Sequence, residues 1–234
     1  MSRICLLGTV HADLDGSRRL RRALDIEKPD ILTVEASYKL IDHISRNRNE
    51  DIKICLEELS KKRISKKTFN FFKEYMEMPS NFEVDECMCY SNEKKIPCHL
   101  IDDPGMVDLL RGHFRELFVN FIQDIDPKDI DNISRKDVIL GHDILYKRMQ
   151  NLYDGKISAI DGEKKLIDVS RGSIIGRRDD YEARKLIKIV EENDGAKIVH
   201  VGGCLHNMDD SKGETLYSRL KNYNPIRRTL LSYD

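Results

Sequence analysis

Two short apolar runs at opposite ends of the chain finish in the same way, and this repeat constrains the fold more than any other feature. One run leads into Gly8-Thr9-Val10-His11, and the other leads into Gly203-Cys204-Leu205-His206. A glycine at the end of a strand allows a sharp backbone turn, which carries the following histidine over the edge of the sheet. If the two strands are neighbours, His11 and His206 converge in one crevice.

The first part of the chain indicates that the sheet is parallel. A segment with helical periodicity separates the apolar run Arg3–Leu7 from a second apolar run, Ile31–Val34. Strand, helix and strand in this order form a βαβ unit, whose crossover requires parallel strands. Glu35 directly follows the second strand, at the carboxyl edge where open parallel sheets bind ligands. We therefore expect Glu35 on the same rim as His11.

The remaining chain indicates further strands and many helices. The expected strands are Ile96–Ile101, Lys197–Gly202 and an edge strand in Ile226–Ser232. The expected helices are Lys39–Arg46, Asp51–Lys61, Lys66–Glu77, Met106–Asp124, Ser134–Tyr153, Asp161–Val169, Asp180–Asn193 and Thr215–Leu220. Glu83–Asn92 shows no clear pattern. We predict an α/β fold with a mostly parallel central sheet flanked by helices, in a single domain over residues 1–234 with a mainly helical insertion at 38–95.

Composition limits the partners and the location of the protein. The chain has 234 residues, enough for one large domain with a sizeable core. Its 40 basic and 41 acidic residues leave a net charge of −1, so no overall field recruits nucleic acid or an acidic membrane. No apolar stretch reaches the roughly 20 residues that span a bilayer. Without a segment like a signal peptide, we expect a cytoplasmic protein with reduced cysteines. The sequence does not decide the oligomeric state, and a homodimer is compatible with it.

His11, His206 and Glu35 form the leading candidate site. Two neutral imidazoles and a carboxylate suit a divalent transition metal such as Mn, Co or Zn. Three protein ligands leave positions open for water, as a hydrolytic site requires. Taken singly, each histidine is explained as well by a structural role as by metal binding. The structural role is helix capping or a hydrogen bond within a loop.

Two further pairs of charged residues allow both a functional and a structural interpretation. Arg178 and Asp179 follow a glycine-containing loop, where they either steady a charged intermediate or simply begin a helix. The pattern alone favours the helix start. Asp102 ends a strand and Arg111 lies in the next expected helix, and the pattern alone favours a structural ion pair.

The other cysteines and histidines are weaker candidates. Cys87-x-Cys89 with Cys98-His99 resembles the ligand pattern of a structural zinc site. However, adjacent residues in a strand point to opposite faces, which argues against joint ligation by Cys98 and His99. His200 alternates with apolar residues in a strand and is expected to be an interior histidine. The charged helical stretches hold three histidines that we expect on the surface, His43, His113 and His142.

Several short stretches, in order along the chain, carry a resemblance to a known family. They are Leu7-Gly8-Thr9-Val10-His11, Pro29-Asp30-Ile31-Leu32-Thr33-Val34-Glu35, Leu100-Ile101-Asp102 with Leu109 and Arg111, Arg178-Asp179-Asp180-Tyr181-Glu182-Ala183, and Val201-Gly202-Gly203-Cys204-Leu205-His206. Together they resemble the TraB/PrgY family, within a wider group that includes the Tiki and GumN proteins and, more distantly, ChaN and the erythromycin esterases. Asp103 and Asp108 depart from the family pattern, which has arginine and threonine there.

The resemblance implies one α/β domain and a function. For the Tiki proteins it implies a metal-dependent protease that uses the two Gly-x-x-His histidines and the glutamate. For the TraB/PrgY branch it implies inhibition of a peptide pheromone by proteolysis or sequestration. Matched residue by residue, the metal and catalytic positions are His11, His206 and Glu35, the supporting site residues are Arg178 and Asp179, and the substrate-binding positions are Asp102, Arg111 and Tyr181.

We therefore expect a metal-dependent hydrolase, most similar to a peptidase, that acts on a peptide or small-molecule substrate. Glu35 is either a third metal ligand or the general base. One alternative is a non-enzymatic protein that sequesters a peptide, a metal or haem in the same crevice. Another is an interaction scaffold that binds partners through the helices of residues 38–78 and 134–153.

Overall fold

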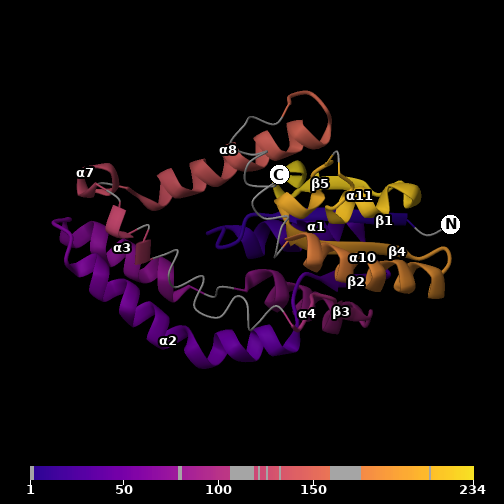
Figure 1. Ribbon diagram of the computed structural model, residues 1–234, viewed down its shortest axis with the longest axis horizontal. Coiled ribbons are helices and arrows are strands. Elements are labelled where there is room, and N and C mark those ends of the chain that lie inside the picture. Colours follow the sequence, from indigo (N-terminus) through magenta and orange to yellow (C-terminus); the bar gives the residue numbers. More distant parts are fainter. Residues whose placement is uncertain are drawn as a thin grey trace.

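A parallel sheet forms the centre of the protein (Figure 1). The computed structural model describes residues 3–78, 81–105, 119–120, 122–124, 126–131, 133–158, 175–210 and 212–234. Over these residues the sheet has five strands in the order β3-β2-β4-β1-β5, and every neighbouring pair is parallel. The strands are β1 (Arg3–Thr9), β2 (Ile31–Val34), β3 (Cys98–Leu100), β4 (Lys197–Gly203) and β5 (Ile226–Thr229). The predicted α/β fold is confirmed.

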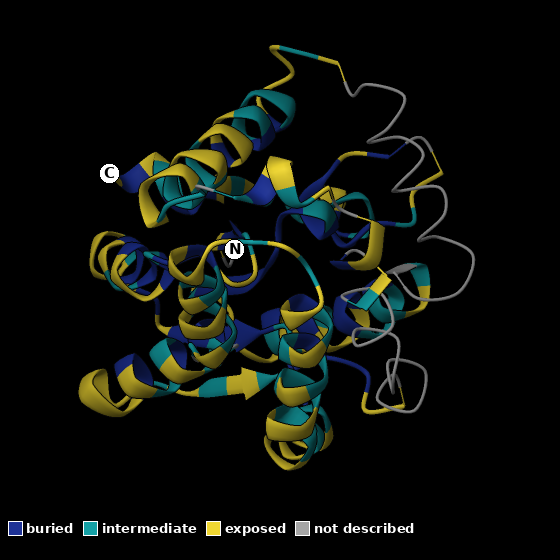
Figure 2. Cartoon of the chain, turned by 90° about the vertical axis from the view of Figure 1, so that its left-hand side faces the viewer, coloured by how far each residue is buried: buried dark blue, intermediate teal, exposed yellow. Residues whose placement is uncertain are grey.

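Helices cover both faces of the sheet, which explains why the central strands are apolar runs without alternation. Cys5 and Leu7 of β1 face a core formed with α1 (Gly16–Glu27), α4 (Phe82–Lys94) and α8 (Arg135–Tyr153). Ile4 and Leu6 face the other core, formed with α10 (Ile175–Glu192) and α11 (Leu216–Leu220). In Figure 2 the sides of these helices that face the sheet are buried and the outer sides are exposed.

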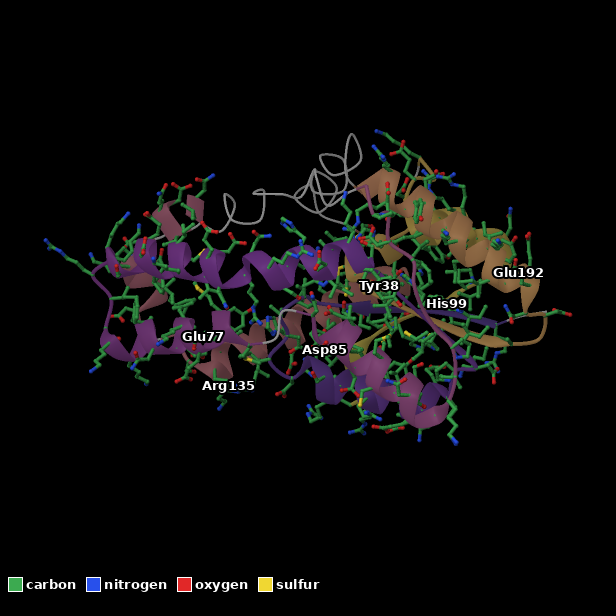
Figure 3. All side chains as sticks on the ribbon, turned by 90° about the horizontal axis from the view of Figure 1, so that it is seen from below. Tyr38, Glu77, Asp85, His99, Arg135 and Glu192 are labelled. Atoms are coloured by element: carbon green, nitrogen blue, oxygen red, sulfur yellow. The ribbon has the colours of Figure 1, made fainter. Side chains whose placement is uncertain are left out.

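A helical arm extends from the sheet and has a small core of its own. It comprises α2 (Tyr38–Ser60), α3 (Lys66–Glu77) and α7 (Pro127–Ile130), which lie on the left in Figure 1. Figure 3 labels Tyr38 and Glu77, the first residue of α2 and the last of α3. The buried residues of the arm's core are Cys55, Leu59, Ile122 and Ile130.

Three short 3-10 helices complete the described structure. They are η1 (Cys204–Asn207), η2 (Lys221–Tyr223) and η3 (Leu230–Tyr233). Among the described residues, no helix is both long enough and apolar enough to cross a membrane.

Several expected boundaries are wrong. The two helices expected at Lys39–Arg46 and Asp51–Lys61 are one helix, since no proline or glycine interrupts the segment between them. The side-chain amide of Asn47 also donates to the backbone carbonyl of His43 at 2.8 Å, so this asparagine is accommodated inside the helix. α10 begins before the expected residue, and β3 is shorter than expected.

Segment 83–92, where no pattern was visible, lies in α4. The buried face of this helix includes Glu83 and Ser91 beside apolar residues, so it does not stand out as an apolar stripe. Most of the helix expected at Met106–Asp124, and all of the one at Asp161–Val169, lie outside the described residues.

Candidate functional site

The register of the sheet brings the two Gly-x-x-His segments together. β1 and β4 are neighbours, with Gly8 opposite Gly202 and Thr9 opposite Gly203. His11 follows β1, and His206 lies in η1 directly after β4. The two histidines therefore leave the same edge of the sheet from adjacent strands.

Gly203 lies at the point where the three leading candidates meet. A Cβ atom at this position would lie 3.0 Å from His11 Nε2, 3.4 Å from His206 Cδ2 and 3.5 Å from Glu35 Oε2. The backbone N–H of Gly203 also donates to Glu35 Oε2 at 2.6 Å. The glycine is thus needed for the close approach of both rings and the carboxylate.

A tight turn positions the His11 side chain. The backbone N–H of Asp13 donates to the Val10 carbonyl at 3.1 Å, and Ala12 takes a left-handed conformation with φ of 63°. His11 Nδ1 lies 2.9 Å from Glu83 Oε1, which also accepts from the Thr9 hydroxyl at 3.0 Å. The His11 side chain is 63% exposed. Although desolvation of the ring opposes it, the hydrogen bond and the charge of Glu83 raise the pKa of His11.

His206 has a carboxylate partner at the same ring position. Its Nδ1 hydrogen-bonds to Asp179, whose second oxygen accepts the backbone N–H of Leu216 at 2.8 Å. Its Nε2 lies 3.2 Å from Glu35 Oε1. Burial opposes the charged ring, but Asp179 and Glu35 together raise the pKa of His206 well above its usual value.

The two histidines therefore share one arrangement. A carboxylate at Nδ1 fixes the orientation of an imidazole and favours a proton on that nitrogen, which leaves Nε2 to face the site. Glu83 does this for His11 and Asp179 does it for His206. No sequence pattern indicated Glu83, because this residue lies in the segment whose helix was not predicted.

Arg178 joins two buried carboxylates at the rim of the sheet. One guanidinium nitrogen lies 2.6 Å from Glu35 Oε1 and 2.9 Å from Asp102 Oδ2, and Nε donates to Asp102 Oδ1 at 3.0 Å. Burial opposes ionisation of Glu35, but His206 and Arg178 hold its pKa well below the usual value. Glu35 is therefore an ionised carboxylate.

These contacts correct one interpretation based on pattern alone, that of Arg178. Arg178 is not a solvated residue at a helix start, because α10 begins at Ile175 and the Arg178 side chain is only 13% exposed. Asp102 pairs with Arg178, and the expected partner Arg111 lies outside the described residues.

The remaining described candidates make other contacts, although His200 is a neighbour of Glu35: a Cβ atom at Gly202 would lie 2.8 Å from Glu35 Oε2 and 2.9 Å from His200 Nε2. Tyr181 is on α10 with its ring 5.5 Å from Lys185 Nζ. His200 is fully buried in β4, where its Nδ1 lies 3.0 Å from the Thr33 hydroxyl, as expected of an interior histidine. Burial raises the pKa of the Cys204 thiol to about 12, so this cysteine is not a thiolate nucleophile.

A cavity of about 560 Å³ opens in front of the site. His11, Glu35 and Arg178 contribute to its wall, together with residues of α2 and α3. His206 is buried behind this wall, next to Glu35. His43, which we expected on the surface, also lines the cavity.

The described residues do not contain a complete set of metal ligands. No group of three or more His, Cys, Asp or Glu side chains among them is arranged to hold an ion. This includes the cysteine-rich segment, where Cys87 is buried and Cys89 is exposed beside Glu93. His11 and His206 supply two nitrogen donors, and Glu35 supplies oxygens that already accept bonds from Arg178 and Gly203.

Comparison with known proteins identifies no relative: the chain matches no protein-family model, no curated protein and no solved structure.

Proposed function

We propose that this protein is a metal-dependent hydrolase, similar to a peptidase and of the TraB/PrgY and Tiki type. The observation that carries the proposal is the pair of histidines with a carboxylate at Nδ1, beside an ionised glutamate. Metal-binding histidines in proteins usually have such a partner, which orients the ring and strengthens the donor nitrogen. Two histidines that each have a carboxylate partner, and that follow adjacent strands, are hard to explain by packing alone.

The chemistry of the donor atoms suits a divalent transition metal, although no three of these side chains among the described residues are already arranged around an ion. His11 and His206 would hold the ion through Nε2, because a carboxylate holds Nδ1 of each ring. The contact of His206 Nε2 with Glu35 Oε1 at 3.2 Å would give way to the ion. Two imidazoles with a carboxylate suit Mn, Co or Zn, and such an ion supplies Lewis acidity for hydrolysis. The proton on His206 competes with the ion, so affinity for the metal should fall as the pH is lowered.

Glu35 and Arg178 have distinct roles in the proposed reaction. Glu35 is ionised and lines the cavity, so it can accept a proton from an attacking water. Arg178 also lines the cavity, and its charge stabilises negative charge that develops on a carbonyl oxygen. Asp102 keeps the guanidinium in place, because it accepts from Nε and from the same terminal nitrogen that contacts Glu35.

The proposal is tested by hydrolysis of a peptide library with added Mn, Co or Zn. We expect activity in the unmodified protein and its loss in His11→Ala, His206→Ala and the double variant. His99→Ala is the matched control, because His99 is exposed on β3 and does not line the cavity. Unchanged activity in the double variant would rule the proposal out.

A second variant separates the two roles of Glu35. Glu35→Gln keeps the size of the side chain but removes its charge. Loss of activity with full metal content would assign Glu35 as the general base. Loss of the metal as well would assign it as a ligand.

The cavity also favours a second candidate function, sequestration of a ligand without chemistry. Its volume of about 560 Å³ lies in the range of binding sites for small molecules. This candidate predicts tight binding of a ligand without turnover. A cleavage product detected by mass spectrometry would exclude it as the full account.

A further inference from the structure

The cavity in front of the candidate site continues along the helical arm, where its wall is apolar. α2 and α3 contribute six apolar side chains there, Leu40, Ile41, Ile44, Ile52, Cys55 and Met76. The candidate site, with His11, Glu35 and Arg178, contributes to the same cavity. A ligand bound at the site can therefore extend into an apolar space.

The spacing of these residues makes the apolar part of the wall long. Leu40 and Cys55 both line the cavity, and both belong to the continuous helix α2. At 1.5 Å per residue, the helix between them is roughly 22 Å long. An extended ligand matches this shape better than a compact one.

The polar side chains along the arm already have partners within the protein. The Tyr75 hydroxyl donates to the Ala12 carbonyl at 3.2 Å, and Arg48 donates to the Met76 carbonyl at 3.2 Å. His43 Nδ1 lies 3.2 Å from the side-chain amide of Asn47, and Asp51 also has a partner. A ligand in this part of the cavity therefore meets mainly hydrocarbon surface.

This hydrocarbon surface distinguishes between two kinds of extended ligand, a peptide and a hydrocarbon chain. A peptide carries an N–H and a C=O at each residue, and both lose free energy if they are buried without partners. Strand addition does not supply these partners, because neither edge strand, β3 or β5, contributes a described residue to the cavity wall. A hydrocarbon chain makes no such demand.

We propose that the cavity binds an unbranched acyl chain, with the ester or amide carbonyl of the ligand beside His11, Glu35 and Arg178. The substrate class of the proposed hydrolase is then an acyl ester or acyl amide, so this inference rests on the proposed function. In the reaction the oxygen of water bonds to the acyl carbon and the bond to the leaving oxygen or nitrogen breaks. A proton of the water passes to the leaving alcohol or amine, and a fatty acid is released.

Binding is tested first, on protein stripped of metal, by displacement of a fluorescent fatty acid with acetate, octanoate and palmitate. Each buried CH₂ group should tighten binding by about fourfold until the cavity is filled, so palmitate should compete far better than acetate. Equal competition by acetate and palmitate would overturn the proposal. An apolar peptide that displaces the probe when palmitate does not would overturn it as well.

A pair of variants tests where the acyl chain of the ligand lies in the cavity. Ile44→Trp fills the cavity one helical turn from Leu40, so palmitate should lose at least tenfold in affinity while acetate is unaffected. Ser45→Trp is the matched control, because Ser45 is exposed on the same helix and does not line the cavity. Equal effects of the two variants would contradict the assignment, and the chain-length series on the unmodified protein tests it independently of folding of either variant.

Hydrolysis of p-nitrophenyl acetate, octanoate and palmitate with added metal then separates the two proposals. Activity that rises with chain length supports both. Binding that depends on chain length, without hydrolysis of any ester, amide or peptide, supports the acyl cavity and contradicts the hydrolase. Hydrolysis of peptides only, with no binding of palmitate, supports the hydrolase and contradicts the acyl cavity.

Discussion

At the scale of single residues, the carboxylates behind the histidines define the site. Glu83 lines the cavity and Asp179 is buried away from it, and each bonds Nδ1 of a histidine. Replacing either with the neutral amide should weaken metal binding by about 10–100-fold, because the ring loses the partner that orients it. Calorimetric titration of Glu83→Gln and Asp179→Asn measures this loss.

The neighbouring acidic residues give matched controls for these two variants. Asp85 is exposed on α4, and Asp180 pairs with Arg184 and Arg219 away from the histidines. Asp85→Asn and Asp180→Asn should leave the metal affinity unchanged. Equal losses in all four variants would show that Glu83 and Asp179 act only through general charge.

Arg178 should contribute strongly to stability as well as to the site. Arg178→Met would leave Glu35 and Asp102 buried without their shared cation. Such a change costs about 3–5 kcal/mol. Urea unfolding at neutral pH measures it, and Arg177→Met is the control because Arg177 is 63% exposed. A difference of less than about 1 kcal/mol between the two variants would contradict the role of Arg178 as a buried bridge.

The sequence predicted part of this arrangement at the residue scale. The convergence of His11, Glu35 and His206 could be predicted, because each lies just after an apolar run. Parallel strands place such positions at one edge of the sheet. Glu83 could not be identified, because its contact with His11 depends on the packing of α4. The pairing of Arg178 with Asp102 also depends on tertiary structure, which no local pattern encodes.

At the scale of elements, β4 carries a buried histidine that links stability to pH. Burial lowers the pKa of His200 from 6.5 to about 4. Between these values the unfolded chain takes up a proton that the folded protein does not. The contribution of neutral His200 is therefore complete above pH 6.5, and it is lost as the pH falls toward about 4.

One pKa unit corresponds to about 1.4 kcal/mol. The fall of the His200 pKa from 6.5 to about 4 should therefore make this loss roughly 3 kcal/mol. His200→Gln keeps a hydrogen-bonding group near Thr33 but cannot titrate. Unfolding free energies of metal-free protein, measured between pH 4 and 7, should decline less with acid in this variant than in the unmodified protein. His99→Gln, on the exposed edge strand β3, should behave like the unmodified protein, and identical pH profiles for all three would contradict the prediction.

The elements that were predicted correctly are those whose sequence pattern matches their environment. β1 and β4 are apolar because both faces of the sheet are covered. α4 was missed because polar side chains occupy part of its buried face. The division of α2 into two helices was wrong because its central asparagines are weak helix formers that the surrounding helix nevertheless accommodates.

At the scale of the whole molecule, the sheet and the helical arm should differ in local stability. All residues of β1 except Arg3 are buried, whereas α2 buries only Cys55 and Leu59 among its 23 residues. Because local stability follows buried apolar contact, amides of α2 and α3 should exchange with solvent orders of magnitude faster than those of β1 and β4. Hydrogen exchange followed by mass spectrometry measures this, and equal protection of arm and sheet would contradict it.

This difference also bears on the proposed acyl site. The arm supplies the apolar wall of the cavity, while the sheet supplies the candidate site. A bound acyl chain should therefore slow exchange in α2 and α3 and leave β1 and β4 unchanged. The sequence indicated a helical insertion here, but it could not show that the arm and the sheet edge enclose one cavity.

The central claim is that His11 and His206 together hold a divalent metal beside Glu35, and the content of bound metal tests it most directly. Elemental analysis after dialysis against Mn, Co or Zn should find one ion per chain in the unmodified protein and in His99→Ala. The double variant His11→Ala with His206→Ala should contain none. An unmodified protein without metal, or a double variant that retains its ion, would contradict the account.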